Sequence, residues 1–121
     1  MRIGLDLDGC VMSHPEFFRE LVESFTERGH QFFCTSGRGR DVWESKCVPD
    51  LLGVGIDPNK IDPRLMTPTV TPHVADKGRM ADHLDLVFDD DAARIQRHTN
   101  TPVLFVPVKR TGWAFSYVRV E

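Results

Sequence analysis

The sequence predicts an α/β fold with a doubly wound (Rossmann-like), mainly parallel sheet, and three observations favour it. Short apolar segments typical of strands alternate along the chain with segments of helical periodicity. Polar residues suited to chemistry follow the ends of these strands, where parallel sheets bind ligands. The chain has 121 residues, close to the commonest domain size. We therefore expect residues 1–121 to form a single domain.

The first third of the chain predicts two strands with a helix between them. Residues Arg2–Leu7 alternate apolar with other residues and predict a buried strand. Pro15 suits the first turn of a helix, and apolar residues then recur at helical spacing as far as Phe25. Gly29 suits the C-cap of that helix. The apolar segment Gln31–Thr35 predicts the second strand.

The rest of the chain continues the alternation less regularly. Arg40–Leu52 has helical periodicity, interrupted at Pro49. The proline-rich residues 53–75 predict a loop, with one short strand near Arg64–Met66. A helix capped by Asp76 is expected to follow, as far as Leu84. The remaining expected elements are a strand over Leu86–Phe88, a helix over Ala92–His98, a strand over Val103–Val106, and an edge strand over the tail with Trp113, Phe115 and Tyr117.

Composition excludes several classes of protein. The net charge is −3, from 15 basic and 18 acidic residues, which gives no general attraction to nucleic acid or to a membrane surface. No apolar stretch approaches the ~20 residues that cross a bilayer, and Asp6 and Asp8 interrupt the segment where a signal peptide would be apolar. Three cysteines without CxxC spacing argue against disulfides and structural zinc. We expect a cytoplasmic protein in which Cys10, Cys34 and Cys47 are buried hydrophobic residues.

Acids, a hydroxyl and a lysine follow the predicted strand ends. Clustered carboxylates repel one another unless a cation binds them, and hard oxygen donors select Mg²⁺. A lysine and a hydroxyl beside that metal suit a phosphate. We therefore expect metal-assisted phosphoryl transfer, in which one aspartate attacks phosphorus and a second protonates the leaving oxygen. The residues concerned are Asp6 and Asp8, Ser36, Lys77, and the run Asp89-Asp90-Asp91.

These motifs, in this order, resemble the haloacid dehalogenase-like (HAD) superfamily. Members begin with a strand that ends in DxDG and have a Ser or Thr at the end of the next strand. A lysine near the start of a helix and an acidic pair after another apolar strand complete the set. The matching residues are Asp6-Leu7-Asp8-Gly9, Ser36, Lys77 and Asp89-Asp90.

The resemblance implies a role for each matching residue. Asp6 is expected to be the nucleophile that forms an aspartyl-phosphate, and Asp8 the general acid and then base. The presence of Asp8 favours a phosphatase over a dehalogenase. Ser36 and Lys77 are expected to hold the phosphate. The implied Mg²⁺ ligands are Asp6, Asp8 through its backbone carbonyl, and Asp90, with Asp89 as a supporting acid.

The motif spacing leaves no room for the cap domains that larger HAD members insert. Only a few residues separate the first motif from the following helix, and the predicted helix and loop occupy most of the gap between the second and third motifs. We therefore expect an open site, able to accept nucleotide or polynucleotide-end phosphates, and no membrane partner. Gly37 and Arg38, with Arg40, are expected to bind the substrate beyond the transferred phosphate.

Three other functions stay open from the sequence. A response-regulator receiver domain uses similar residues, but its acidic pair follows the first strand and its lysine the last, which is not the order seen here. A catalytically idle HAD-like scaffold would bind a partner without turnover, and need not keep the acids and the lysine. A Mg²⁺-dependent nuclease could use the same acids. The sequence leaves substrate identity and oligomeric state open.

Overall fold

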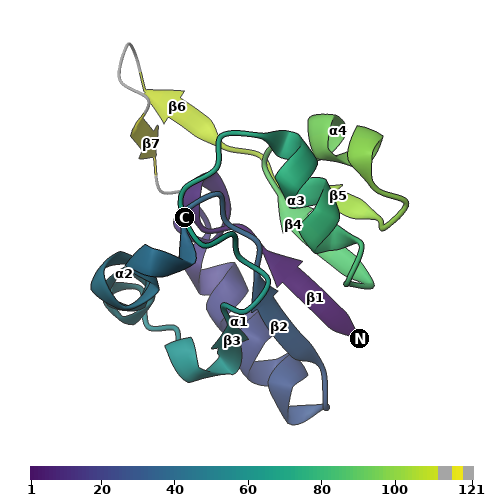
Figure 1. The fold of residues 1–121 in the computed structure, drawn as a ribbon. Helices are drawn as coiled ribbons and strands as arrows, with labels where there is room; N and C mark the ends of the chain where they lie inside the picture. The colour runs from purple at the N-terminus through teal and green to yellow at the C-terminus, as the bar shows by residue number, and fades with distance from the viewer. Residues whose placement is uncertain (112–115, 119–121) are drawn as a thin grey trace.

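A five-stranded, all-parallel sheet forms the centre of the protein, with the strand order β3-β2-β1-β4-β5 (Figure 1). The computed structural model describes residues 1–111 and 116–118, with side chains over residues 1–108. The predicted parallel α/β architecture is confirmed. The strands are β1 (Arg2–Leu5), β2 (Gln31–Cys34), β3 (Ile61–Asp62), β4 (Leu86–Asp89) and β5 (Val103–Phe105).

Helices cover both faces of this sheet (Figure 1). On one face α1 packs through Phe18 and Val22, and on the other α3 packs through Ala81, with α4 beside it. The helices are α1 (Pro15–Glu27), α2 (Val48–Gly53), α3 (Val74–Ala81) and α4 (Ala92–Ile95), joined by short helical turns at Leu7–Val11, Arg40–Val42, Trp43–Cys47, Pro58–Lys60 and Gln96–His98.

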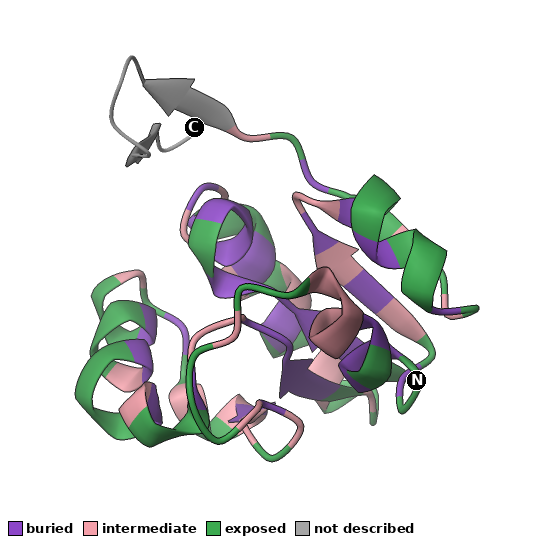
Figure 2. Ribbon diagram, turned by 45° about the horizontal axis from the view of Figure 1, so that its top comes forward, coloured by how far each residue is buried: buried purple, intermediate pink, exposed green. Residues whose placement is uncertain are grey.

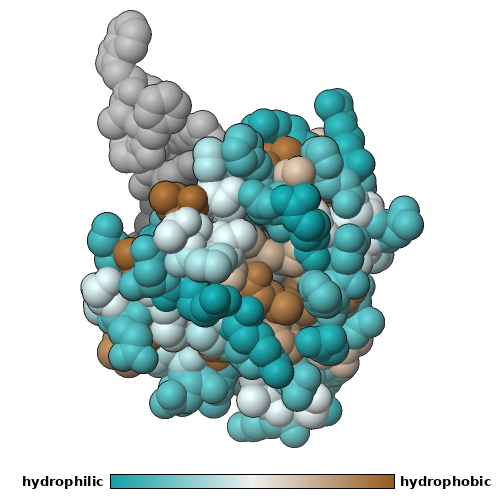
Figure 3. All heavy atoms as spheres, in the orientation of Figure 1, coloured by the Kyte–Doolittle hydropathy of each residue, from teal (hydrophilic) through white to brown (hydrophobic). Residues whose placement is uncertain are grey.

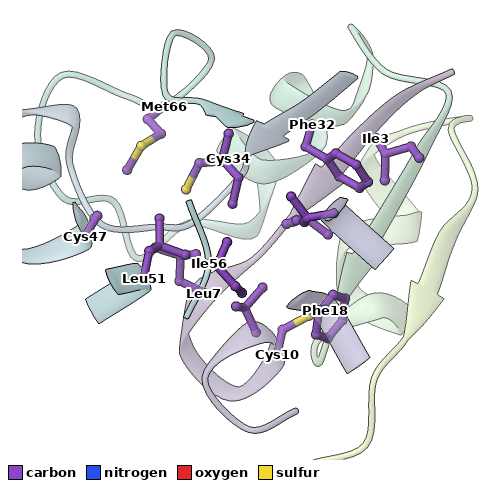
Figure 4. Packing of buried hydrophobic residues seen from close by; sticks show 14 of the residues in the cluster. Ile3, Leu7, Cys10, Phe18, Phe32, Cys34, Cys47, Leu51, Ile56 and Met66 are labelled. Carbon is purple, nitrogen blue, oxygen red and sulfur yellow. The ribbon is translucent and has the colours of Figure 1, made fainter. Parts of the chain in front are cut away.

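Two hydrophobic clusters lie on the two faces of the sheet, because successive strand residues point to opposite sides. In β2, Phe32 and Cys34 belong to the larger cluster, and Phe33 between them belongs to the smaller one. The central strands β1 and β2 are therefore largely buried (Figure 2). Cys10, Cys34 and Cys47 are free thiols buried in the larger cluster (Figure 4), as their expected packing role requires.

The first predicted strand ends earlier than expected, and this change shapes the site. Pairing stops at Leu5, and the chain then turns through Leu7–Val11. Gly9 has a φ of 73° in this turn, a left-handed conformation that strains other residues. The turn places Asp6 at the end of β1 and leads the chain back into α1.

The segment between β2 and α3 departs furthest from expectation. The predicted 40–52 helix is three short segments, the last of which, α2, begins at Val48 beside the proline. The short strand lies at Ile61 rather than at 64–66, because Ile61 is buried and pairs with Phe32. The predicted cap Asp76 is wrong: α3 begins at Val74, and the Asp76 carboxylate instead accepts a hydrogen bond from the hydroxyl of Thr71.

A two-stranded antiparallel hairpin, β6 (Lys109–Thr111) and β7 (Ser116–Val118), follows the main sheet. Tyr117 lies in β7, whereas Trp113 and Phe115 of the expected edge strand lie outside the described residues. Within the described part of the chain, no helix has the length and apolar character needed to cross a membrane. Hydrophilic side chains predominate on the face shown in Figure 3, and the hydrophobic ones form small separate groups.

Candidate functional site

A cavity of about 430 Å³ lies at the carboxyl ends of β1, β2 and β4. This is the edge at which ligands bind in open parallel sheets, where the chain connections run to opposite sides. The cavity is lined by the predicted site residues with two exceptions, Arg40 and Asp89, and Asp89 is fully buried beside Asp90. The lining consists of Asp6, Asp8, Ser36, Gly37, Arg38, Val70, Thr71, Pro72, His73, Val74, Lys77, Asp90, Asp91 and Arg94.

Three carboxylates and one ammonium, which we call the inner cluster, lie at one end of this cavity. They belong to Asp6, Asp89, Asp90 and Lys77. Carboxylate oxygens of the three aspartates lie within 4.8 Å of one another. The Nζ of Lys77 donates to Oδ1 of Asp6 at 3.1 Å and to Oδ2 of Asp89 at 2.9 Å. Asp6 is only 3% exposed and Asp89 is 0% exposed, so water solvates their charges poorly.

Burial and mutual repulsion make this cluster electrostatically costly. Burial raises the pKa of Asp6 well above its usual value, the ammonium of Lys77 opposes this, and the Asp89 charge adds to it. Burial likewise raises the pKa of Asp89. Burial lowers the pKa of Lys77, but the charges of Asp6 and Asp89 outweigh it and the pKa ends above its usual value. One ammonium therefore faces three carboxylates, an excess of negative charge that a hard cation would neutralise.

A second charged group, which we call the outer network, consists of Asp8, Arg38 and Asp50. The guanidinium of Arg38 donates to both carboxylate oxygens of Asp8, from Nε at 3.0 Å and from Nη2 at 2.6 Å. Its third arm, Nη1, donates to Oδ2 of Asp50 at 2.7 Å. The hydrogen bond to Asp8 raises the pKa of Arg38 despite partial burial, and the bond to Asp50 adds to this. Arg38 therefore stays charged beside the cavity.

Residues 70–74 line another part of the cavity and lie close to the segment after β2. The backbone N–H of Thr71 donates to the carbonyl of Gly37 at 2.9 Å. A Cβ on Gly37 would lie 2.9 Å from the carbonyl oxygen of Thr71, so only glycine allows this approach. The buried Ser36 hydroxyl accepts from the backbone N–H of Arg38 at 3.1 Å. Ser36, Gly37 and Arg38 thus form one continuous edge of the cavity.

Arg40 does not join Arg38 at the cavity. Its Nη1 donates to the carbonyls of Met66 at 2.9 Å and of Arg64 at 3.3 Å, and it is not among the described lining residues. The expectation that Arg40 binds substrate is therefore replaced by a role in holding the loop before α3.

Sequence reasoning missed two charged residues near the site. Arg94 lines the cavity and pairs with Asp91 at 3.1 Å. Asp91 directly precedes the predicted helix that contains Arg94, and their three-residue spacing could have indicated that they lie close together. Asp50 had no such signal, because its partner Arg38 lies in a different segment and only the docking of α2 brings them together.

No protein-family model, curated protein or solved structure matches the chain. The arrangement of the site is therefore the basis for assigning a function.

Proposed function

We propose that this protein is a cap-less, HAD-like, Mg²⁺-dependent phosphatase that hydrolyses a phosphomonoester through an aspartyl-phosphate. One observation carries the proposal. Asp6, Asp90, Ser36 and Lys77, which come from four separate segments of the chain, line one cavity with Asp89 directly beside them. The order of motifs in the sequence and their meeting in space are consistent with the same chemistry.

The inner cluster fits a magnesium ion. Asp6, Asp89 and Asp90 offer hard oxygen donors close enough together to share one ion, and one or two of them would suffice because Mg²⁺ keeps several waters. The backbone carbonyl of Asp8 is the further ligand that the HAD resemblance implies. When bound, Mg²⁺ would neutralise charge on the phosphate and on the carboxylates.

In the first half of the proposed reaction, a carboxylate oxygen of Asp6 attacks phosphorus and the bond from phosphorus to the ester oxygen breaks. Asp8 donates a proton to the departing oxygen, which leaves as an alcohol. The ammonium of Lys77 and the hydroxyl of Ser36 hydrogen-bond the phosphoryl oxygens, where negative charge must be stabilised. The result is an acyl phosphate on Asp6.

In the second half, water attacks the phosphorus of the aspartyl-phosphate. Asp8, now ionised, accepts the proton of that water, and the bond from phosphorus to Asp6 breaks. Inorganic phosphate leaves, and both aspartates return to their starting states. The proton that Asp8 gave to the alcohol is replaced by the one taken from water.

The shape and lining of the cavity support a class of substrate. Gly37 and Arg38 lie next to Ser36 at the cavity edge, where they would contact the part of the substrate beyond the transferred phosphate. Among the described residues no cap domain covers the cavity, and an open cavity suits nucleotides or the phosphorylated ends of polynucleotides.

The experiment that tests this function measures release of p-nitrophenol from p-nitrophenyl phosphate. We expect turnover with Mg²⁺, none in EDTA, and a loss of about a thousandfold or more in Asp6→Asn, because the nucleophile is gone. Asp62→Asn is the matched control, since Asp62 pairs with Arg64 at 2.9 Å and is not among the cavity lining. Full activity in EDTA or in Asp6→Asn would falsify the proposal.

The alternative is a phosphoacceptor or binding module without turnover. A stable phosphorylated Asp6 after incubation with acetyl phosphate, with no continued release of phosphate, would favour that alternative. Cleavage of unphosphorylated DNA or RNA would favour a nuclease instead.

A further inference from the structure

Arg38 is held between two carboxylates from different parts of the chain. Its guanidinium donates hydrogen bonds to Asp8 from two nitrogens and to Asp50 from the third. Asp8 follows β1 and lines the cavity, whereas Asp50 lies on α2 and is not part of the described lining. Asp50, which lies outside the cavity lining, is thus linked to the proposed proton donor Asp8 through the side chain of Arg38.

The geometry gives Asp50 a specific mechanical role. The backbone of Arg38 is already fixed by its hydrogen bond to Ser36, so the remaining freedom lies in the long side chain. A bidentate guanidinium–carboxylate pair fixes orientation as well as distance. With Asp50 holding Nη1, the guanidinium keeps its place when Asp8 releases one of its two hydrogen bonds.

That release is what proton transfer requires. Both carboxylate oxygens of Asp8 accept from Arg38 in this structure. One oxygen must release its hydrogen bond and take up a proton from solvent water, and it can then pass that proton to the leaving oxygen. Arg38 can keep its hydrogen bond to the other oxygen of Asp8 only if another group holds the guanidinium in place. The Asp50 side chain is 46% exposed and the Arg38 side chain 18% exposed. Asp50 therefore holds the more buried Arg38 from the solvent side.

We propose that Asp50 is a positioning residue, which anchors Arg38 and through it orients Asp8 for proton transfer to the leaving group. This role rests on the proposed function, because it requires Asp8 to be the general acid. It differs from a structural role, in which Asp50 would only attach α2 to the segment after β2. The two roles predict different dependence on the leaving group.

The test compares two substrates that differ in their need for a proton. Nitrophenolate leaves readily without protonation, whereas the alkoxide of β-glycerophosphate needs a general acid. For Asp50→Asn we expect kcat/KM to fall about tenfold or more on β-glycerophosphate, a part of the roughly 10²–10⁴-fold that acid–base catalysis supplies. On p-nitrophenyl phosphate we expect kcat/KM to change by less than about twofold, because departure of nitrophenolate needs no acid and kcat/KM does not include the later step in which Asp8 acts as a base.

A double mutant tests whether Asp50 acts through Asp8. Asp8→Asn should itself lose more on β-glycerophosphate than on p-nitrophenyl phosphate, and adding Asp50→Asn should then cause no further loss on either ester. Asp50→Glu should restore part of the loss, since it keeps a carboxylate for Nη1. Asp62→Asn, which removes a comparable surface carboxylate paired with arginine, should leave both rates unchanged. Circular dichroism and the Tm of each variant report whether it is folded.

Each contrary outcome has a distinct meaning. Equal losses of Asp50→Asn on both esters, or no loss on either, in an active wild-type protein would overturn the positioning role alone. Additive losses in the double mutant would also overturn it. A wild-type protein that hydrolyses neither ester would overturn the proposed function, and the role of Asp50 with it.

Discussion

The inner cluster and the outer network both combine carboxylates with one cationic side chain, but they differ in burial and in the excess of negative charge. In the inner cluster, three largely buried carboxylates face one ammonium, that of Lys77. In the outer network, two half-exposed carboxylates share the guanidinium of Arg38. Water screens the outer charges, but it reaches Asp6 and Asp89 hardly at all.

This difference is the basis of the separate roles that we propose, cation binding for the inner cluster and positioning for the outer network. The inner cluster stores repulsion that folding alone does not relieve, as expected where a protein gives up stability for function. The outer network has a smaller excess of negative charge, because two carboxylates share one guanidinium, and it is well paired in geometry. We therefore propose that it orients groups rather than attracting a cation. Three stability measurements on the protein in EDTA test this contrast.

The largest effect is expected from Lys77→Met, which removes the ammonium but keeps much of the side-chain volume. Asp6 and Asp89 would both lose their partner while staying buried, and breaking a buried pair costs about 3 kcal/mol. We expect Tm to fall by roughly 10 °C, with part of the loss recovered on adding Mg²⁺. Lys46→Met, at an exposed position, is the matched control. An unchanged Tm for Lys77→Met would show that the inner carboxylates do not depend on this ammonium.

A smaller effect of opposite sign is expected from Asp90→Asn. This change removes one like charge and leaves Lys77 both of its hydrogen-bonded carboxylates. We expect the metal-free protein to gain about 1 kcal/mol, of the size usual for stabilising substitutions. We expect Mg²⁺ to raise the Tm of the wild type, and this rise should be lost in Asp90→Asn.

Asp89→Asn is the comparison for that result, since it removes a carboxylate that does pair with Lys77. It should therefore show less gain than Asp90→Asn. If Asp90→Asn lowered Tm in EDTA, repulsion would not be the dominant interaction in the inner cluster.

The smallest stability effect is expected from Asp50→Asn. Its ion pair with Arg38 is half-exposed on the Asp50 side, and such pairs contribute less than about 1 kcal/mol. We expect the free energy of unfolding, from urea denaturation, to change by less than this, and the difference to shrink further in high salt. A loss as large as that of Lys77→Met would make the outer network structural and remove the contrast.

Local patterns predicted most of the sheet and the meeting of several polar residues at its edge. The strands at Gln31–Cys34, Leu86–Asp89 and Val103–Phe105 were expected within a residue or so, because each is a short apolar run with polar residues after it. Asp6 and Ser36 were expected at one edge because carboxyl ends of parallel strands meet there. They do line one cavity.

Features that depend on docking were not predicted. β3 is only two residues long, so it carries no periodicity, and its place is decided by Ile61 pairing with Phe32. The expected 40–52 helix had a plausible apolar face, but it breaks into short turns before α2. Asp76 was expected to cap a helix, but its carboxylate accepts a hydrogen bond from Thr71 in the preceding loop.

The sequence by itself determined the alternation of strands and helices and the order of the acids, the hydroxyl and the lysine along the chain. These follow from hydrophobic period and local turn chemistry, which act over a few residues. The tertiary structure alone decided which charges pair: Lys77 with Asp6 and Asp89, and Arg38 with Asp8 and Asp50. Charge pairing depends on separations of a few ångströms and on the exclusion of water, and both are established only when distant segments pack together.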